Sequence, residues 1–303
     1  MTSQKATLIG LIAVVLWSTI VGLVRSVSEG FGAVGGAAMI YTLSSVMLFI
    51  TVGFPKIKTF PVSYLITGSI LFVCYELCLS LSLGYANNST QAIEVSMVNY
   101  LWPSLTILLS VLVNRQKTSL VIIPGMLLAL MGIGWVLGGD KGLSLSCIIN
   151  NLYSNPLSYG LAFGGAIIWA IYCAMTKKIA NGANGITLFF ILTALTLWVN
   201  YLLAPQPEFI ISMPVIISLI LAAGAMGFGY AAWNIGILHG NVTVLATASY
   251  LIPVISAALA AFILNSTLTV AFWQGAAMVS LGSLLCWWST RSATVENVSE
   301  QAN

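Results

Sequence analysis

Charged side chains are scarce in this chain of 303 residues. Asp, Glu, Lys and Arg together make up 6% of it, against about 25% in an ordinary soluble domain. Hydrophobic residues make up 59%, and a soluble fold cannot bury so much apolar surface. The bilayer is therefore the expected solvent, and we predict an all-α integral membrane protein.

Other absences exclude whole classes of function. The chain has no long basic tract for nucleic acid and no phosphate-binding G-x-x-x-x-G-K-[ST] motif, so nucleic-acid binding and ATP hydrolysis are not expected. Its five cysteines show no spacing typical of a disulfide framework or a zinc site. No nucleophile–base pair or metal cluster falls within the apolar stretches. We therefore expect no enzyme, no metal and no cofactor.

Ten apolar stretches are long enough to cross about 30 Å of hydrocarbon. They cover residues 6–24, 33–54, 64–85, 90–112, 120–138, 157–176, 184–204, 213–237, 241–264 and 270–289. Residues 139–156 form the longest connection, and their apolar residues predict a short amphipathic segment on the membrane surface. Residues 291–303 form a polar C-terminal tail, which we expect to be disordered.

Basic residues indicate the orientation, because cytoplasmic loops of membrane proteins are enriched in Lys and Arg. With a cytoplasmic N-terminus, only Arg25 and Lys141 lie outside. The inner side receives Lys5, Lys56, Lys58, Arg115, Lys117, Lys177, Lys178 and Arg291. Both termini are therefore predicted to be cytoplasmic.

The two halves of the chain match at an offset of 150 residues. Tyr100, Pro103, Gly125 and Gly132 correspond to Tyr250, Pro253, Gly275 and Gly282. Residues 1–138 and 157–290 would thus be two five-helix repeats joined by an outer loop, 139–156. Because five is odd, the second repeat must run inverted. This arrangement is typical of transporters, whose substrates bind between the repeats near the midplane.

Glu76 and Glu94 are the only acidic residues within the predicted spans, which contain no Lys or Arg. An ionised carboxylate near the middle of a span costs at least about 2.5 kcal/mol. Glu76 is therefore predicted either to bind a substrate ammonium group or take part in proton coupling, or to be a neutral carboxyl bonded to neighbouring helices, such as to Ser80. Glu94 lies near the outer boundary, and we expect it at a partly wet mouth.

Aromatic and polar residues share helix faces on several spans. Trp17, Trp102, Trp169 and Trp233 lie too deep for interfacial anchors, which is the role that fits other tryptophans. Pro103 and Pro253 are expected to kink the fourth and ninth spans, or only to shape their packing. Aromatic rings with a few amides and hydroxyls would form a central cavity suited to a planar ligand with a polar end. The alternative for each aromatic residue is ordinary core packing.

The pattern of spans resembles the drug/metabolite transporter superfamily (EamA-type), and more narrowly the aromatic amino acid exporters of the YddG type. Residues 5–13, 16–19, 92–95, 98–106, 231–234 and 237–243 carry this resemblance, and the segments Asn99-Tyr-Leu-Trp-Pro and Leu238-His-Gly-Asn are far more specific than the general repeat pattern. The resemblance covers residues 2 to 291. It implies export of phenylalanine, tyrosine and tryptophan across a bacterial inner membrane by alternating access.

The resemblance also implies that the first, third, fourth, sixth, eighth and ninth spans line a cavity. Tyr75, Trp102, Trp169 and Trp233 would stack on the substrate ring, and Glu76, Asn99 and Asn234 would meet its polar end. Trp17, Tyr100 and Tyr250 complete the expected substrate site, and Pro103 and Pro253 would act as hinges. We expect a functional monomer in the lipid bilayer, with protons as a second partner. A polyspecific drug exporter is the alternative, and a channel or membrane scaffold is a third class.

Overall fold

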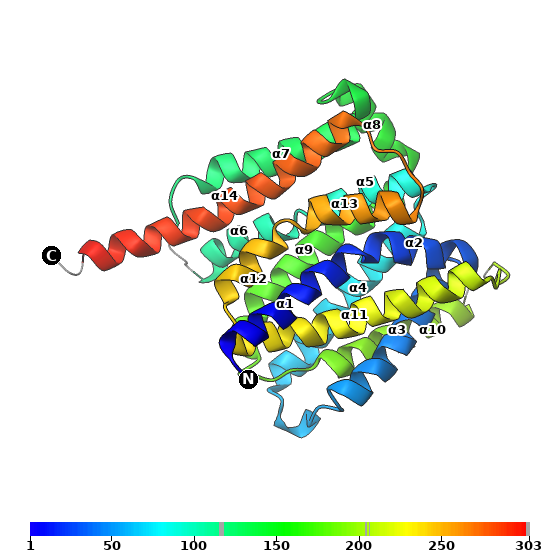
Figure 1. Cartoon of the computed structure of the whole chain (residues 1–303), viewed down its shortest axis with the longest axis horizontal. Coiled ribbons are helices and arrows are strands. Elements are labelled where there is room, and N and C mark those ends of the chain that lie inside the picture. Colours follow the sequence, from blue (N-terminus) through cyan, green and yellow to red (C-terminus); the bar gives the residue numbers. More distant parts are fainter. Residues whose placement is uncertain (115–117, 204, 206, 301–303) are drawn as a thin grey trace.

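The structure is a computed structural model that describes residues 1–114, 118–203, 205 and 207–300. Arg115, Lys117 and the last three residues lie outside this part of the chain. Its regular elements are helices (Figure 1). The first half contains α1 (Ser3–Ser18), α2 (Ile20–Phe31), α3 (Ala33–Thr51), α4 (Ser69–Gly84), α5 (Ser89–Asn99), α6 (Trp102–Asn114) and α7 (Ile122–Leu137). The second half contains α8 (Leu145–Ser154), α9 (Pro156–Ile179), α10 (Ile186–Leu203), α11 (Met213–His239), α12 (Val242–Ser249), α13 (Ile252–Ile263) and α14 (Val270–Glu300).

Each of the ten apolar stretches is occupied by one helix or by a broken pair of helices. Within the described residues, 7 helices are long and apolar enough to cross a membrane, and the bent pair α1–α2 brings the number to 8. The shorter apolar helices α7 and α13 occupy parts of the fifth and ninth stretches. The N-terminus and the far end of α14 lie toward the same side of the bundle, on the left in Figure 1.

Two of these breaks fall at equivalent places in the two halves. The first follows α5 at Tyr100 and Leu101, and the second follows α12 at Tyr250 and Leu251. In both cases proline is the second residue of the next helix. A proline has no backbone N–H, so the carbonyl four residues earlier loses its helical partner and the helix is interrupted there. Both prolines therefore stand at interruptions of their spans, and their role as kinks or hinges stays a prediction.

A third break separates α1 from α2 at Thr19, with a bend of 41°. The Thr19 hydroxyl donates to the carbonyl of Leu16 at 2.7 Å, and Ser18 donates to Val14 at 2.7 Å. Hydroxyls that bond back to carbonyls of the preceding turn bend membrane helices. The helical path then continues to Phe31, beyond the expected limit at residue 24.

The packing of helix pairs follows the same offset of 150 residues. The most extensive contacts are those of α7 with α14, α1 with α11, α3 with α10, and α4 with α9. At this offset α1 corresponds to α9, and α4 corresponds to α11, so the α1–α11 pair is equivalent to the α4–α9 pair. At the same offset α3 corresponds to α10 and α7 corresponds to α14, so each of these two pairs joins equivalent helices of the two halves.

The α7–α14 pair is packed around four glycines. A Cβ on Gly132 would lie 2.7 Å from the carbonyl oxygen of Gly275, and one on Gly275 would lie 2.6 Å from that of Gly132. Gly125 and Gly282 face each other in the same way, at 3.0 and 2.7 Å. Small residues allow membrane helices to approach closely. Since Gly125 corresponds to Gly275 and Gly132 to Gly282, the contacts cross over, as in an interface with two-fold symmetry.

The connection between the halves contains the expected amphipathic segment, which forms α8. An apolar groove of about 550 Å³ lies between α5, α7, α8 and α9. At the other end of the chain, α14 continues as a helix through Glu300. The expectation of a disordered tail is therefore wrong for residues 291–300, where the long apolar helix simply extends into the polar segment.

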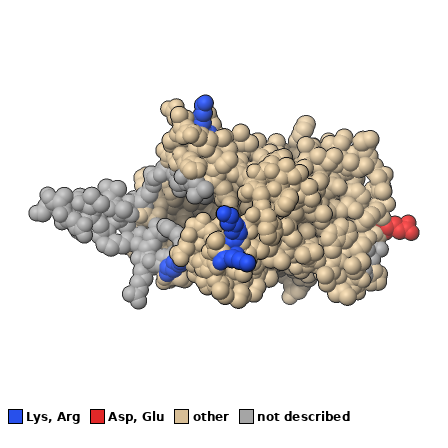
Figure 2. All heavy atoms as spheres, turned by 90° about the horizontal axis from the view of Figure 1, so that it is seen from below, with Lys and Arg blue, Asp and Glu red and all other residues tan. Residues whose placement is uncertain are grey.

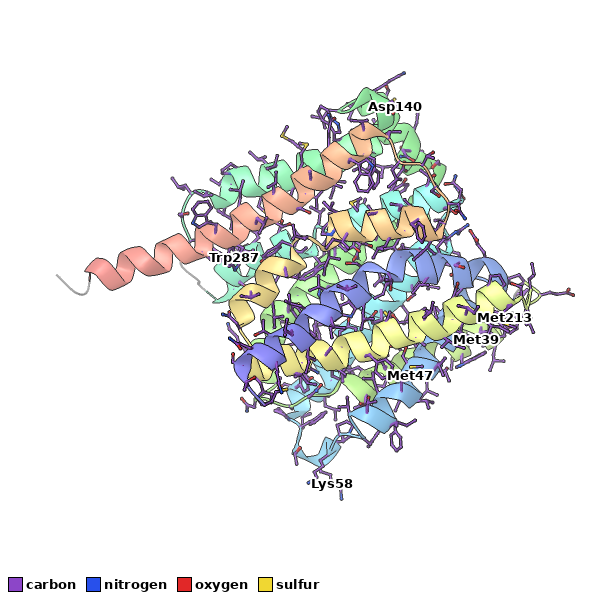
Figure 3. All side chains as sticks on the ribbon, in the orientation of Figure 1. Met39, Met47, Lys58, Asp140, Met213 and Trp287 are labelled. Atoms are coloured by element: carbon purple, nitrogen blue, oxygen red, sulfur yellow. The ribbon has the colours of Figure 1, made fainter. Side chains whose placement is uncertain are left out.

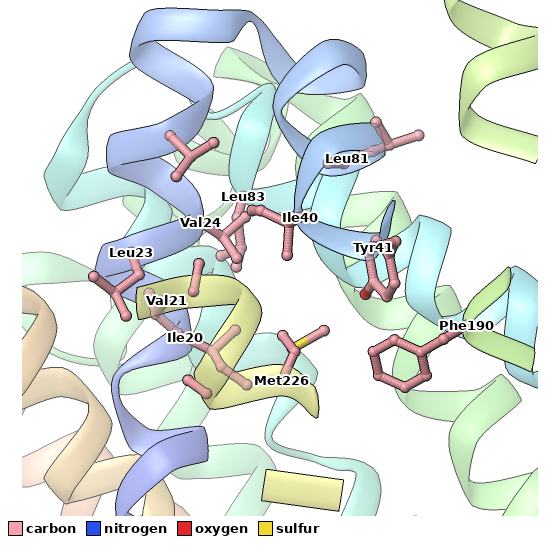
Figure 4. Packing of buried hydrophobic residues seen from close by; sticks show 14 of the residues in the cluster. Ile20, Val21, Leu23, Val24, Ile40, Tyr41, Leu81, Leu83, Phe190 and Met226 are labelled. Carbon is pink, nitrogen blue, oxygen red and sulfur yellow. The ribbon is translucent and has the colours of Figure 1, made fainter. Parts of the chain in front are cut away.

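Apolar side chains fill the bundle and also cover its outer surface. In the interior, the Tyr41 ring packs against Phe190 with centroids 5.4 Å apart, beside Ile40 and Met226 (Figure 4). Charged groups are few on the face seen in Figure 2. Lys58 and Asp140 lie at opposite edges of the view in Figure 3.

Candidate functional site

A cavity of about 300 Å³ lies at the centre of the helix bundle, between the two halves of the chain. This volume is at the lower end of the range for small-molecule sites. Its described lining comes from α1, α2, α4, α5, α6, α9, α11, α13 and the break between α5 and α6. These helices occupy the six stretches that the family resemblance implies as the lining of the cavity.

Aromatic rings form one continuous wall of this cavity. Trp169 on α9 stacks on Tyr75 of α4, with centroids 4.4 Å apart and planes at 28°. On its other side it stacks on Tyr172, at 4.9 Å and 16°. Trp102 meets the edge of Trp169 at 6.4 Å. Such pairs contribute about 0.5–1.5 kcal/mol each beyond simple burial, so this wall is held in place before any ligand binds.

A second aromatic group lines the cavity from α1 and α11. The Trp17 ring lies 5.0 Å from Tyr230 and 5.2 Å from Trp233. Its indole nitrogen is buried against Gly229, where an added Cβ would lie only 2.6 Å away. This nitrogen has no hydrogen-bond partner within the described part of the chain. Trp17 and Trp233 therefore offer apolar ring surface to the cavity.

Glu76 on α4 is the acidic group of the cavity, and its side chain is 0% exposed. Tyr41 of α3 donates to Oε2 at 2.5 Å, and Tyr230 of α11 donates to Oε1 at 2.7 Å. Ser80 in turn donates to the Tyr41 hydroxyl at 3.1 Å. The two tyrosine hydroxyls donate to the carboxylate and Ser80 supports one of them, so α3, α4 and α11 are tied together at this point. No described Lys or Arg forms an ion pair with Glu76.

The other polar groups of this region are committed to helix contacts. Asn99 donates to the carbonyl of Ala162 at 3.2 Å, which joins the end of α5 to α9. Glu94 accepts from Asn151 and from Tyr159, each at 3.0 Å, and thus joins α5 to α8 and α9. Glu94 is outside the cavity lining. Its carboxylate belongs to a polar cluster where α5 and α9 meet α8.

Comparison with known proteins agrees with this architecture. An EamA-like transporter family model matches residues 156–288. Two curated proteins named "Aromatic amino acid exporter YddG", from Escherichia coli and Salmonella typhimurium, are each 64% identical over 96% of this chain and 99% of their own length. The chain belongs to this transporter family.

More distant relatives share the same outline. A protein of the same name from Ancylobacter novellus is 25% identical over 84% of this chain and 88% of its own length. One solved crystal structure, 20% identical, covers 96% of this chain and 99% of its own with a TM-score of 0.66. That likeness shows the fold alone.

The structure of this family member brings together most of the site residues that the sequence suggests. Eight of them line the cavity: Trp17, Tyr75, Glu76, Asn99, Tyr100, Trp102, Trp169 and Trp233. Asn234 does not belong to the lining. Tyr250 packs instead against Trp287, with centroids 6.2 Å apart, in a separate cluster with Ile107 and Cys286. Contact with substrate stays a prediction for all ten.

Sequence reasoning missed two tyrosines. Neither Tyr230 nor Tyr41 is among the site residues that the sequence suggests. Tyr230 lines the cavity and bonds Glu76 across 154 residues of sequence. Tyr41 lies outside the described lining and bonds Glu76 across 35 residues. No local pattern pairs residues so far apart. The available signal was Glu76 itself, because a buried carboxylate requires hydrogen-bond donors from neighbouring helices.

Proposed function

We propose that this protein exports aromatic amino acids across a bacterial inner membrane. The observation that carries the proposal is the central cavity, in which several aromatic rings surround one buried carboxylate. Aromatic walls suit the side chains of phenylalanine, tyrosine and tryptophan. Glu76 supplies an acceptor for the ammonium group that these substrates share. The name shared by the three relatives supports the same substrate class.

Transport would occur by alternating access between two inverted five-helix repeats. Support comes from the matching breaks at Tyr100 and Tyr250, from the exchange of helix pairs at the offset of 150 residues, and from the crossed glycine contacts of α7 and α14. Pro103 and Pro253 stand at the two breaks, where a hinge needs the fewest backbone hydrogen bonds to change. With ten spans, both termini lie in the cytoplasm.

The substrate ring would pack on the wall formed by Tyr75 and Trp169, with Trp102 and Trp233 beside it. Because Tyr75 and Trp169 already stack at 4.4 Å, the substrate lies against their outer edges and does not enter between them. Trp17 and Tyr100 would close the remaining sides. The cavity lies within a single chain, so a monomer would suffice for transport.

Flux measurements in reconstituted vesicles test the proposal. Labelled phenylalanine should enter vesicles containing the purified protein in a saturable way, and unlabelled tryptophan should inhibit this entry. An imposed pH gradient tests proton coupling, for which Glu76 is the first residue to substitute. Absence of saturable phenylalanine flux in folded protein would refute the proposal.

A polyspecific exporter of cationic aromatic drugs is the second candidate. The observation that favours it is the lone acidic group in an otherwise apolar, aromatic cavity. An amino acid site should discriminate against analogues in which the ammonium group is blocked, whereas a drug site should respond to ring size and net charge alone. Competition against phenylalanine flux by N-acetylphenylalanine and by aromatic dyes that carry a quaternary ammonium separates the two.

A further inference from the structure

The charged side chains that line the described cavity are of one sign only. Its described lining contains one carboxylate, Glu76, and no Lys, Arg or His. An amino acid carries two charges of opposite sign, and only its ammonium finds an opposite charge here. The inference drawn below rests on the proposed function, because it concerns the same cavity and the same aromatic ligands.

Glu76 has acceptor capacity left for a cation. A carboxylate offers about four lone-pair sites, and Tyr41 and Tyr230 each occupy one. An ammonium group has three donors and no acceptor, so it complements the unused sites of this group. Burial of an unpaired charge at this depth is costly, and a bound ammonium cancels that charge.

The surrounding rings favour a cation at the same place. Tyr230, whose hydroxyl bonds Glu76, lies with its ring 5.0 Å from that of Trp17 and 6.4 Å from that of Trp169. Tryptophan and tyrosine faces attract ammonium groups within about 6 Å of the ring centre. Glu76 shares its cavity lining with these rings, so an ammonium bound to it enters a site with aromatic walls.

The carboxylate of an amino acid meets a poorer environment. The Asn99 amide already donates to Ala162, and the Trp17 indole nitrogen is buried against Gly229. A carboxylate that enters the cavity loses water and gains at most neutral donors. An aromatic amine without a carboxylate avoids this loss and still forms the ion pair with Glu76.

We propose that aromatic primary amines, the decarboxylated counterparts of the aromatic amino acids, are a second class of substrate for this cavity. The geometry assigns recognition to the ammonium and the ring, and assigns no specific group to the substrate carboxylate. Phenethylamine, tyramine and tryptamine have the required parts. A desamino acid such as 3-phenylpropionate has the ring and the carboxylate but lacks the group that Glu76 binds.

Competition for phenylalanine binding to the purified protein in detergent gives the first test, and no variant is needed. Phenethylamine should displace labelled phenylalanine within about tenfold of the concentration that unlabelled phenylalanine needs, and 3-phenylpropionate should be about tenfold to a hundredfold weaker than phenethylamine. Glu76→Gln should remove this preference for the amine. Glu94→Gln is the matched control, since Glu94 is the other glutamate within the spans and lies outside the cavity, and it should keep the preference.

Uptake of labelled tyramine tests transport, with protein-free vesicles giving the passive flux to subtract. Saturable tyramine uptake that phenylalanine inhibits supports the inference. Phenylalanine flux without saturable tyramine flux, or stronger displacement by 3-phenylpropionate than by phenethylamine, overturns it and leaves amino acid export intact. Tyramine flux without phenylalanine flux supports the amine site and refutes the proposed function. Failure of both fluxes in folded protein refutes both.

Discussion

Substitution of Gly132 by alanine probes the contact between α7 and α14. The added Cβ would lie 2.7 Å from the carbonyl oxygen of Gly275 and 2.8 Å from the nitrogen of Val279. Both are backbone atoms, so no side chain can turn away to make room. Since ordinary contacts begin at 3.4 Å, α14 must withdraw by 3.4 − 2.7, or about 0.7 Å, along this stretch.

Gly164→Ala is the matched control, because a Cβ on Gly164 in α9 meets nothing within 4 Å. Both substitutions gain the helix preference of alanine over glycine, about 1 kcal/mol, and this gain cancels in the comparison. What remains is the overpacking at α14, which typically costs about 1–3 kcal/mol. Gly132→Ala should therefore be less stable than Gly164→Ala by that amount.

Thermal unfolding of the purified variants in detergent measures this difference. Gly275→Ala should behave like Gly132→Ala, since its Cβ would lie 2.6 Å from the Gly132 carbonyl. The double variant should lose less than the sum of the two, because one withdrawal of α14 makes room for both methyl groups. Substrate preference should not change, since α7 and α14 contribute nothing to the described cavity lining. Equal unfolding temperatures for Gly132→Ala and Gly164→Ala would refute the close approach of the helices.

Three further predictions concern the cavity and its surroundings. Trp169→Ala removes two stacked contacts, at 4.4 and 4.9 Å, and should lower the unfolding free energy by about 1–3 kcal/mol and weaken phenylalanine binding. Trp169→Phe should restore much of the stability and of the phenylalanine affinity. Equal phenylalanine affinities for wild type and the alanine variant would contradict the stacking role. Tyr41→Phe removes a hydrogen-bond donor from Glu76 and an acceptor from Ser80, and all three residues are buried. Thermal unfolding should therefore show that the unfolding free energy falls by about 1–3 kcal/mol. An unchanged unfolding temperature would mean that these hydrogen bonds do not form. In a variant with Cys173 as its sole cysteine, phenylalanine should slow the labelling of this thiol by a maleimide, because Cys173 lines the cavity. Labelling at the same rate with and without phenylalanine would mean that the substrate binds elsewhere.

Sequence alone predicts the helices well because the bilayer imposes a simple requirement of length and apolarity. It also predicts two of the three breaks, since Pro103 and Pro253 remove backbone donors wherever they stand. The bend at Thr19 escapes this reasoning. It depends on hydroxyls that bond back to Val14 and Leu16, and other hydroxyls in these spans, such as those of Thr42 and Thr193, make such bonds without a break.

The site is predictable to the level of the helix face and no further. Trp233 and Asn234 are neighbours in sequence, but only Trp233 reaches the cavity. Tyr100 and Tyr250 are equivalent in the repeat, but Tyr250 packs toward Trp287 while Tyr100 lines the cavity. The repeat fixes the backbone position of a residue, and the two halves then fill the space around it with different side chains.

The crossed glycine contacts also bear on how separate halves of the chain would associate. A surface that touches its own counterpart across a two-fold axis is the kind by which two separate copies of one polypeptide associate. On the proposed architecture of two inverted repeats, two separate copies of one half would meet across this same glycine seam while lying in opposite orientations in the membrane.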